Sequence, residues 1–428
     1  MSRMSERKAF SSYLEVGYDP YGREDCPANI IFEVFQMHIA GIDIAKNNHE
    51  VTLIDEKGNI IGKSLRFANK FNGFNKLMAF IRNHVPDTSD VVFGMEATGH
   101  YWLALYAHLR QAGFKVHVIN PIQSDALRGL YIRQTKNDSK DSFIIAEVIR
   151  FGRFSETNIS SPDMHALREL CRHRFFIVDS VSDIKRKVIA LLDQVFPEYE
   201  SLFTDTFGKT SLQLLSEYST PEEILALDSD KLCEIINSAS RGRFGLDKAK
   251  QIQDTARNSF GIMLATDSFG LLIRQYIEHI FFVEKQLQNI EDEIERLLAG
   301  FECQLSTITG VGSTLAAVIL SEIGDVRKFD SSAKLAAFAG IDPTVKQSGE
   351  FNGTRCRMSK RGSPYLRRAI WLASTVAAFR DPAINALYLK KRNEGKSHMT
   401  TMGHICRKMI SIIFAVLRDN SPYKPAII

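Results

Sequence analysis

Residues 38–69 read HIAGIDIAKNNHEVTLIDEKGNIIGKSLRFAN, and this stretch decides the fold of the N-terminal part of the chain. It contains three short runs rich in β-forming residues: HIAGIDIAK, HEVTLIDEKGN and IIGKSLRFAN. Lys57, Gly58 and Asn59 separate the second run from the third, and glycine and asparagine readily adopt turn conformations. The stretch therefore predicts a meander of three β-strands.

Helices and strands alternate after this meander. We expect a helix over 71–84, a strand over 90–96, a helix over 101–112 and a strand over 115–120, followed by a helix that opens near Asp138. This order is typical of an RNase H-like α/β domain, which we assign to residues 37–155. Residues 1–36 carry no clear period, so we treat them as an N-terminal extension.

The composition narrows the class of protein. A chain of 428 residues is expected to form two or three domains, and contents of 44% hydrophobic and 24% charged residues are typical of a soluble globular protein. The first residues lack the apolar core typical of a signal peptide, and no run of about eighteen uncharged apolar residues occurs, so we expect a cytoplasmic protein without a membrane partner. Its six cysteines are scattered and form no CxxC pair, which disfavours a zinc site or a disulfide framework.

The charge is distributed unevenly along the chain. The net charge is +4, but residues 351–428 contain fifteen Lys and Arg and only three acidic residues, which leaves −8 for the remainder. A net charge of +12 sustained over this length favours contact with a polyanion. The alternative is a basic face that is merely solvated.

Two aspartates open the helix in QTKNDSKDSFIIAEVIRFG, residues 134–152. Asp138 and Asp141 are three residues apart, so both carboxylates lie on one helical face. On these residues alone, a solvated acidic helix start is the simpler interpretation, because a carboxylate near a helix N-terminus interacts favourably with the helix dipole.

Two further carboxylates stand on the predicted strands. Asp43 lies in the apolar run AGIDIA, where a buried carboxylate needs a partner or a cation, and Glu96 ends the fourth strand. The first and fourth strands of an RNase H-like sheet are adjacent, so both acids should face the helix of Asp138 and Asp141. Such a group of four favours two hard cations, Mg²⁺ or Mn²⁺, although each acid also has a local explanation.

Two heptad runs follow the first domain. They predict long coiled-coil-like helices within residues 156–300, with a helical insertion over 196–272 whose role the sequence does not reveal. The runs could pair with each other as an antiparallel hairpin or form a seam between subunits, and the sequence leaves both open. The heptad positions are Leu167, Leu170, Ile177, Val181, Ile184, Val188, Leu191 and Val195, then Ile273, Tyr276, Ile280, Val283, Leu287, Ile290, Ile294 and Leu297.

Residues 301–428 form the last predicted domain, which is helical. It opens with ITGVG, where Gly310 and Gly312 fit the turn of a helix-hairpin-helix unit, in which backbone N–H groups approach a phosphate. A Gly-x-Gly turn alone is weak evidence for such a unit. The basic segment that follows makes this interpretation stronger.

At these motifs the sequence resembles a known family. GIDIAK, MEATGHYW, VINPIQSDALR with KNDSKDS, ITGVG, AAFAGIDP, QSGEFNGTRCRMSKRG and YLRRAIW are similar to the DEDD-type insertion-sequence transposases of the one-ten family, which are bridge-RNA-guided serine recombinases. The resemblance covers roughly residues 37–155 and 300–420, in order. It does not include residues 1–36, and the middle insertion matches loosely.

The resemblance implies a mechanism with two half-sites. Asp43, Glu96, Asp138 and Asp141 correspond to the family's acidic tetrad in a RuvC-like domain that binds Mg²⁺ or Mn²⁺, and Ser348 corresponds to its nucleophile in a C-terminal transposase domain. Without the family, a loop serine before Gly349 is more often a turn residue. The expected nucleic-acid-binding residues are Arg355, Arg357, Lys360, Arg361, Arg367, Arg368, Gly310 and Gly312.

The implied function is a transposase that cleaves and rejoins double-stranded DNA through a covalent phosphoserine. Its implied partners are an element-encoded bridge RNA and further copies of the chain, as a homodimer or homotetramer, and it is nucleoid-associated when bound to DNA. A metal-dependent junction-resolving endonuclease is the alternative, because the tetrad suits hydrolysis equally. A non-catalytic nucleic-acid-binding protein is a third possibility, although it would leave four aligned carboxylates without a purpose.

Overall fold

The structure is a computed structural model that describes residues 37–119, 124, 127, 138–152, 161–344, 347–348, 351–352 and 357–425. The chain divides into two compact units, with the boundary between residues 158 and 159. Each unit is described by itself.

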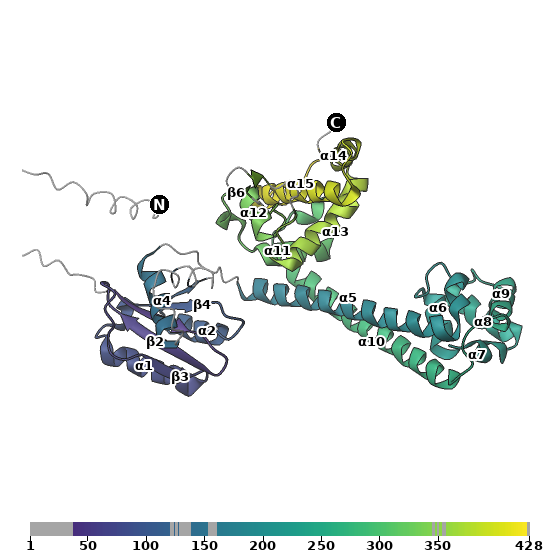
Figure 1. The fold of residues 1–428 in the computed structure, drawn as a ribbon, viewed down its shortest axis with the longest axis horizontal. Helices are drawn as coiled ribbons and strands as arrows, with labels where there is room; N and C mark the ends of the chain where they lie inside the picture. Colours follow the sequence, from purple (N-terminus) through teal and green to yellow (C-terminus); the bar gives the residue numbers. More distant parts are fainter. Residues whose placement is uncertain are drawn as a thin grey trace, which may run out of the picture. The chain divides into compact units, whose positions relative to one another are not determined.

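The first unit is built on a five-stranded mixed sheet (Figure 1). Its strands are β1 (His38–Asp43), β2 (Asn48–Ile54), β3 (Leu65–Ala68), β4 (Val91–Glu96) and β5 (Lys115–Ile119). Their spatial order is β3-β2-β1-β4-β5. The first three strands are antiparallel, and β1, β4 and β5 run parallel. The predicted meander and the adjacency of the first and fourth strands are therefore confirmed.

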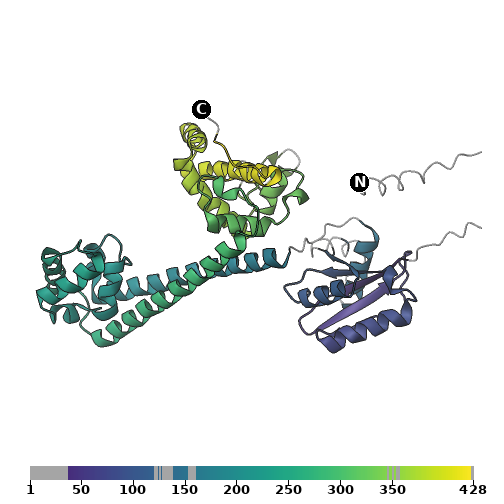
Figure 2. The same cartoon turned by 180° about the vertical axis from the view of Figure 1, so that it is seen from behind.

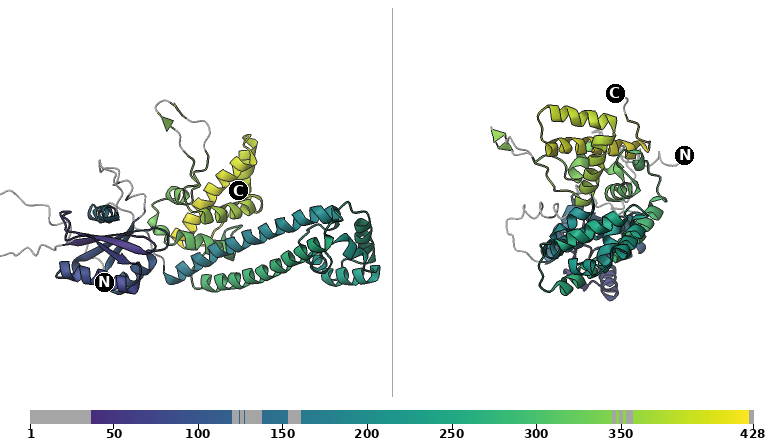
Figure 3. Two further views of the ribbon diagram at one scale, coloured as in Figure 1. Left: turned by 60° about the horizontal axis from the view of Figure 1, so that its bottom comes forward. Right: turned by 90° about the vertical axis from the view of Figure 1, so that its right-hand side faces the viewer.

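Helices cover both faces of this sheet (Figure 3). They are α1 (Phe71–His84), the short 3-10 helix η1 (Thr88–Asp90), α2 (Leu103–Gln111) and α4 (Asp138–Arg150). Helix α4 lies very close to the sheet, since a Cβ atom at Gly41 would collide with the backbone of Ser142 and Ala146. A Cβ at Gly94, which pairs with Gly41 in register, would meet Ile149 of the same helix.

Most boundaries in the first unit agree with the sequence. Helix α1 spans the residues predicted for it, and β4 begins one residue later than expected. Helix α2 begins at Leu103 instead of residue 101. The reason is a turn at Gly99, which has a φ of +56° and whose carbonyl accepts a hydrogen bond from the Trp102 indole at 3.2 Å.

The second unit contains two long helices that pack side by side (Figures 1 and 2). They are α5 (Pro162–Val195) and α10 (Thr266–Leu298). Ser161 caps α5 by accepting a hydrogen bond from the Met164 N–H, and Pro162 occupies the first turn. Val181 and Val283 share one buried cluster, so the heptad positions meet within a single chain as an antiparallel hairpin.

A small helical module joins the far ends of this pair. It consists of η2 (Pro197–Leu202), α6 (Lys209–Glu217), α7 (Pro221–Leu225), α8 (Ser229–Ser240) and α9 (Leu246–Arg257). Its core packs around Tyr199 and Phe196, which are fully buried, together with Ile273, Ile277 and Ile280 of α10.

The other end of the pair belongs to a C-terminal helical body. Leu167 and Cys171 of α5 and Ile294 of α10 are part of its core. Its elements are η3 (Leu305–Thr307), α11 (Ser313–Ile323), η4 (Val326–Lys328), α12 (Ser332–Phe338), β6 (Gln347–Ser348), β7 (Phe351–Asn352), α13 (Pro364–Arg380), α14 (Pro382–Asn393) and α15 (His398–Asp419). The expected class, a mixed α/β sheet with a mostly helical remainder, is confirmed.

Helix α15 is the one helix of the described residues with the length and composition to cross a membrane. Half of its apolar stretch is buried in the protein, where Met402, Ile405 and Met409 join the C-terminal core. Core packing accounts for its apolar residues.

Candidate active site and nucleic-acid interface

Asp43 and Glu96 end two adjacent parallel strands. Ile42 of β1 pairs with Met95 of β4, so the two acids follow one residue later on neighbouring strands. Side chains two residues apart on a strand share a face. Gly41 and Gly94 face α4, and therefore Asp43 and Glu96 lie on the α4 face as well, at the carboxyl ends of their strands.

Helix α4 begins over the same end of the sheet. Ser142, whose carbonyl approaches Gly41, directly follows Asp141. The buried hydroxyls of Ser142 and Thr52 are 2.6 Å apart and fix the helix against β2. The backbone thus brings Asp43, Glu96 and Asp141 to one corner. Asp138 is the first residue of α4, and its side chain lies outside the described residues.

Two hydroxyl groups hold the carboxylate of Glu96. Ser124, which is 1% exposed, donates to one carboxylate oxygen at 2.7 Å, and Thr98 donates to the other at 3.1 Å. Sequence reasoning missed both residues. Thr98 lies in the motif MEATGHYW and Ser124 in the motif VINPIQSDALR, but neither motif by itself marks the hydroxyl as a partner of Glu96.

Glu50 is a further carboxylate that the sequence analysis did not single out. It pairs with Asp43 across β1 and β2, so it lies on the same face, and it accepts a hydrogen bond from the Ser64 hydroxyl at 2.7 Å. In the same register Glu50 pairs with Arg66 of β3, which places a cation beside it.

The donor set at this corner consists of carboxylate oxygens, the ligands that Mg²⁺ and Mn²⁺ prefer. Among the residues whose side chains are described, no three His, Cys, Asp or Glu side chains meet closely enough to form a metal site by themselves. The carboxylate chemistry and the shared face of Asp43 and Glu96 suit a hard cation, and Asp138 and Asp141 stand at the start of α4, which packs over that face.

Ser348 lies on a β-ribbon that extends from the C-terminal body (Figure 3). It pairs with Phe351, so only residues 349 and 350 connect the two short strands. The base of the ribbon is hydrogen-bonded: the Thr344 N–H donates to the Arg357 carbonyl at 2.7 Å, and the Ser359 N–H donates to the Asp342 carbonyl at 2.8 Å. The side chain of Ser348 lies outside the described residues.

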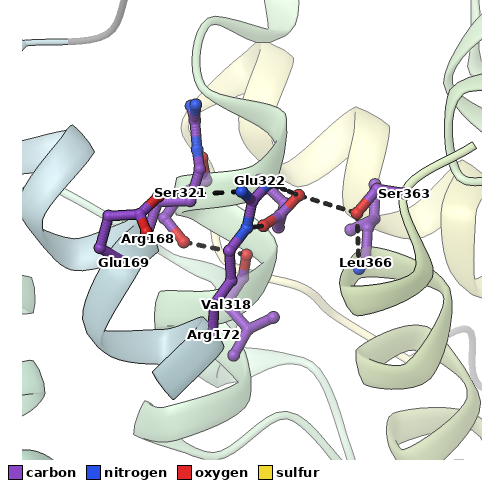
Figure 4. Close-up of polar contacts among 8 residues, drawn as sticks. All are labelled: Arg168, Glu169, Arg172, Val318, Ser321, Glu322, Ser363 and Leu366. Atoms are coloured by element: carbon purple, nitrogen blue, oxygen red, sulfur yellow. Dashed lines mark hydrogen bonds and ion pairs between the residues drawn. The ribbon is translucent and has the colours of Figure 1, made fainter. Parts of the chain in front are cut away.

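An ion pair between a buried carboxylate and a partly exposed arginine supports the body next to this ribbon (Figure 4). Glu322 of α11 accepts hydrogen bonds from Arg172 of α5 at 2.7 and 3.2 Å. It also accepts one from Ser363 at 2.7 Å, and Ser363 caps α13 through the Leu366 N–H. Because the Ser363 N–H donates to the Phe338 carbonyl, the same residue joins α11, α12 and α13 where the ribbon begins.

The predicted phosphate-binding residues divide into two groups. Arg357, Lys360 and Arg361 are exposed near the base of the ribbon, and Arg355 lies outside the described residues. Arg368 forms a bidentate pair with Asp179 of α5, with both distances at 2.7 Å, and lies over the Phe175 ring. Arg367 donates to the Ala339 carbonyl at 3.2 Å. Arg367 and Arg368 therefore already have structural contacts.

The two glycines of ITGVG have different surroundings. A Cβ atom at Gly310 would meet the Ala373 carbonyl of α13 at 2.5 Å, so this glycine permits close packing of the turn against a helix. Gly312 is exposed, has open space around it and precedes α11 without a side-chain cap. The element before the turn is the single 3-10 turn η3, and the helix-hairpin-helix unit stays a prediction.

Comparisons with known proteins cover both units. Residues 40–197 match a family model described as Transposase, of the DEDD IS110 type, and residues 303–389 match the model described as Transposase IS116/IS110/IS902 family. The first region contains the four predicted acids, and the second contains Ser348 and both glycines of ITGVG.

Relatives of similar length extend these matches. The insertion element IS110 43.6 kDa protein of Streptomyces coelicolor is 26% identical, over 74% of this chain and 78% of its own length. The insertion element IS116 44.8 kDa protein of Streptomyces clavuligerus is 23% identical, over 90% of this chain and 96% of its own. The pilin gene-inverting protein of Moraxella bovis is 25% identical, over 90% and 96%.

Proposed function

Because the chain belongs to the IS116/IS110/IS902 transposase family, we propose that it cleaves and rejoins double-stranded DNA through a RuvC-like acidic site and a serine nucleophile. One observation carries the acidic half of this proposal. The sheet register puts Asp43 and Glu96 side by side at the carboxyl ends of β1 and β4, on the face where α4 begins.

In this proposal Asp43, Glu96, Asp138 and Asp141 hold divalent cations, Mg²⁺ or Mn²⁺. Cations bound there would neutralise charge on a phosphodiester and favour ionisation of an attacking hydroxyl. The chain's own residues provide the framework: Ser124 and Thr98 orient the Glu96 carboxylate, and the Thr52–Ser142 contact fixes the height of α4 above β1.

Ser348 is the proposed nucleophile. Its Oγ forms a bond to phosphorus while the bond to one deoxyribose oxygen breaks, and that oxygen leaves as a hydroxyl group after taking up a proton. A phosphoserine ester conserves the bond energy, so the hydroxyl of another strand can later attack it and release the serine. Arg357, Lys360 and Arg361 are exposed near the base of the ribbon and would neutralise the phosphate.

The acidic site is tested by Asp141→Asn, which keeps the side chain's shape and removes its charge. We expect the fold to be kept and strand cleavage in Mg²⁺ to be lost. Asp193→Asn, an exposed aspartate of α5, is the matched control and should cleave normally. Normal cleavage by the Asp141 variant would show that the site is misassigned.

The serine is tested by trapping the reaction on nicked DNA. After protease digestion, a peptide that contains Ser348 should carry DNA, and Ser348→Ala should give neither adduct nor recombination. If the parent protein forms no adduct but cleaves with metal, the junction-resolving endonuclease is the better description, since hydrolysis needs no protein nucleophile.

The partners are proposed on the same basis. An element-encoded bridge RNA would select the DNA, and a homodimer or homotetramer would bring two sites together in the cytoplasm, on the nucleoid. The chain purified from cells should then carry an RNA of defined length. After nuclease treatment removes the RNA, its mass by light scattering should be a multiple of 48.3 kDa. Purified chain free of RNA that still recombines DNA would remove the guide from the proposal.

A further inference from the structure

The sheet of the first unit has a hollow on the face opposite α4. Thr52 of β2 contacts α4, so His49, which is an odd number of residues away, points to the other face. There His49 and Phe67 meet the start of α1 and the side of α2 around a space of about 120 Å³.

The wall of the hollow is aromatic. The rings of Phe71 and Phe74 have centroids 6.4 Å apart in a stacked arrangement, and His108 lies 5.4 Å from Phe74. Phe71 is 68% exposed, an unusual position for a large apolar ring at the start of a helix. Ring faces that are open to solvent at the rim of a hollow can stack with another flat ring.

His49 is held inside the wall of the hollow. It is 1% exposed, and its Nδ1 accepts a hydrogen bond from the Ala45 N–H at 3.3 Å. Burial lowers the pKa of His49, and a side-chain hydrogen bond with Asn69 raises it in part. His49 thus closes the inner side of the hollow, and the exposed rings lie at its rim.

Lys70 brings positive charge to the rim, since it lines the hollow beside Phe71. Arg66 pairs with Glu50 on the α4 face and does not belong to the rim. Lys70 is the N-cap residue of α1 and has no side-chain cap interaction, so the helix start adds N–H donors beside the ammonium group. Aromatic rings interleaved with cations are the means by which proteins bind single-stranded nucleic acid without base pairing.

From these contacts we infer that the hollow formed by His49, Phe67, Phe71, Phe74 and His108 binds one unpaired base of a nucleic-acid strand. The base stacks on Phe71, and its phosphate lies at Lys70 and the start of α1. The site rests on the proposed function only in that a nucleic acid is the partner, since it uses none of the predicted acids and no metal.

The test uses the full chain in EDTA with single strands of about ten nucleotides, DNA in one arm and RNA in the other. Strands that carry 5-iodouracil are irradiated, and the protein is digested with trypsin. The expected crosslink is on residues 71–76, FNGFNK, which the cuts after Lys70 and Lys76 release. A crosslink in one arm alone identifies which strand supplies the base.

Affinity provides the second measurement. Phe71→Ala should weaken binding about tenfold, which corresponds to the loss of one stacked base. Phe176→Ala is the control, because this α5 phenylalanine is 66% exposed and lies outside the hollow. On a backbone strand without bases, Phe71→Ala and the parent chain should bind alike.

Two results would overturn the inference: no crosslink on residues 71–76 in either arm, or equal losses of affinity in the Phe71 and Phe176 variants. Both are independent of cleavage. The Asp141 and Ser348 tests can fail while the base site stands, and the reverse also holds.

Discussion

Gly41 sets the distance between α4 and the sheet, and a single methyl group there should be costly. Gly41→Ala would push against the backbone of Ser142 and Ala146, which cannot rotate away as a flexible side chain could. We expect a loss of about 1–3 kcal/mol in the free energy of unfolding, or more if α4 detaches. Denaturant titration of the variant and the parent chain measures this.

Gly403 is the matched control for this substitution. It lies within α15, and a Cβ atom there would meet nothing within 4 Å. Gly403→Ala should therefore stabilise the protein by about 0.5–1 kcal/mol through helix propensity alone. Equal effects of the two substitutions would contradict the packing that we describe at Gly41.

His49 should make the stability of the first unit dependent on pH. Burial holds the pKa of His49 below its ordinary value of 6.5, so the folded state keeps the ring neutral where the unfolded chain takes up a proton. Stability should consequently fall as the pH is lowered through 6.5 towards the depressed pKa, and level off below it. The measurement is the free energy of unfolding between about pH 5 and 8.

His49→Gln supplies the comparison for the pH effect. The variant has no group that titrates at this position, so its stability should change less with pH over the same range. A slope equal to that of the parent chain would assign the pH dependence to another group.

At the residue scale, the candidate catalytic acids were easier to predict than the residues that hold them in place. Asp43 and Glu96 could be found because each lies on a readable strand, and their adjacency followed from strand order. Asp43 was expected in the middle of its strand, whereas β1 ends at Asp43 and leaves it half-buried. The contact of Ser124 with Glu96 could not be found, because it spans 28 residues and the motif VINPIQSDALR does not mark its serine as a partner of that acid. The roles of Asp138 and Ser348 stay predictions, since their side chains lie outside the described residues.

At the scale of elements, the heptad residues of α5 and α10 pack against each other within one chain, as a hairpin. Ile280 is fully buried in the same core as Ile184 and Val188. We expect Ile280→Ser to cost several kcal/mol, in the range of about 2–5 for truncating a buried Ile, and to unfold part of the second unit. Circular dichroism during denaturation and light scattering together measure this.

Phe282→Ser tests the opposite face of the same helix. Phe282 is 60% exposed, so the change should leave stability within about 0.5 kcal/mol. A stable Ile280 variant that dissociates into monomers would contradict the intramolecular hairpin and favour a seam between subunits. A change of mass in the Phe282 variant alone would place a subunit contact on the exposed face.

The elements show why the apolar period of a helix is easier to recognise in the sequence than the residues against which the helix packs. Helix α1 could be placed to the residue because its apolar spacing and its ends are local features. The choice of buried heptad residue depends on parts of the chain that are distant in sequence. Ile277 lies in the core, whereas the heptad pattern pointed to Tyr276. The Arg368–Asp179 pair joins positions 189 residues apart, so no spacing rule could predict it.

At the scale of the whole molecule, the basic C-terminal end should determine how nucleic-acid affinity depends on salt. Changing Arg357, Lys360 and Arg361 to Gln should weaken binding to all sequences alike. The slope of log affinity against log salt should become shallower by up to about three, because each phosphate contact contributes about 0.9. Binding titrations at several salt concentrations measure the slope.

Exposed cations of the distal module are the control for the salt measurement. Changing Arg241, Arg243 and Lys250 to Gln removes the same charge and should leave the slope unchanged. If both triple variants lower the slope equally, net charge alone governs binding and the ribbon base has no special part in it.

The paired helices α5 and α10 also give the second unit a long span. Helix α5 has 34 residues, and at about 1.5 Å per residue it extends about 50 Å. At about 3.4 Å per base pair, this matches roughly fifteen base pairs of duplex. Since packing against α10 stiffens this span, the C-terminal body and the distal module stand at fixed positions along it. A nucleic acid touched by both would be measured by its length, whatever its sequence.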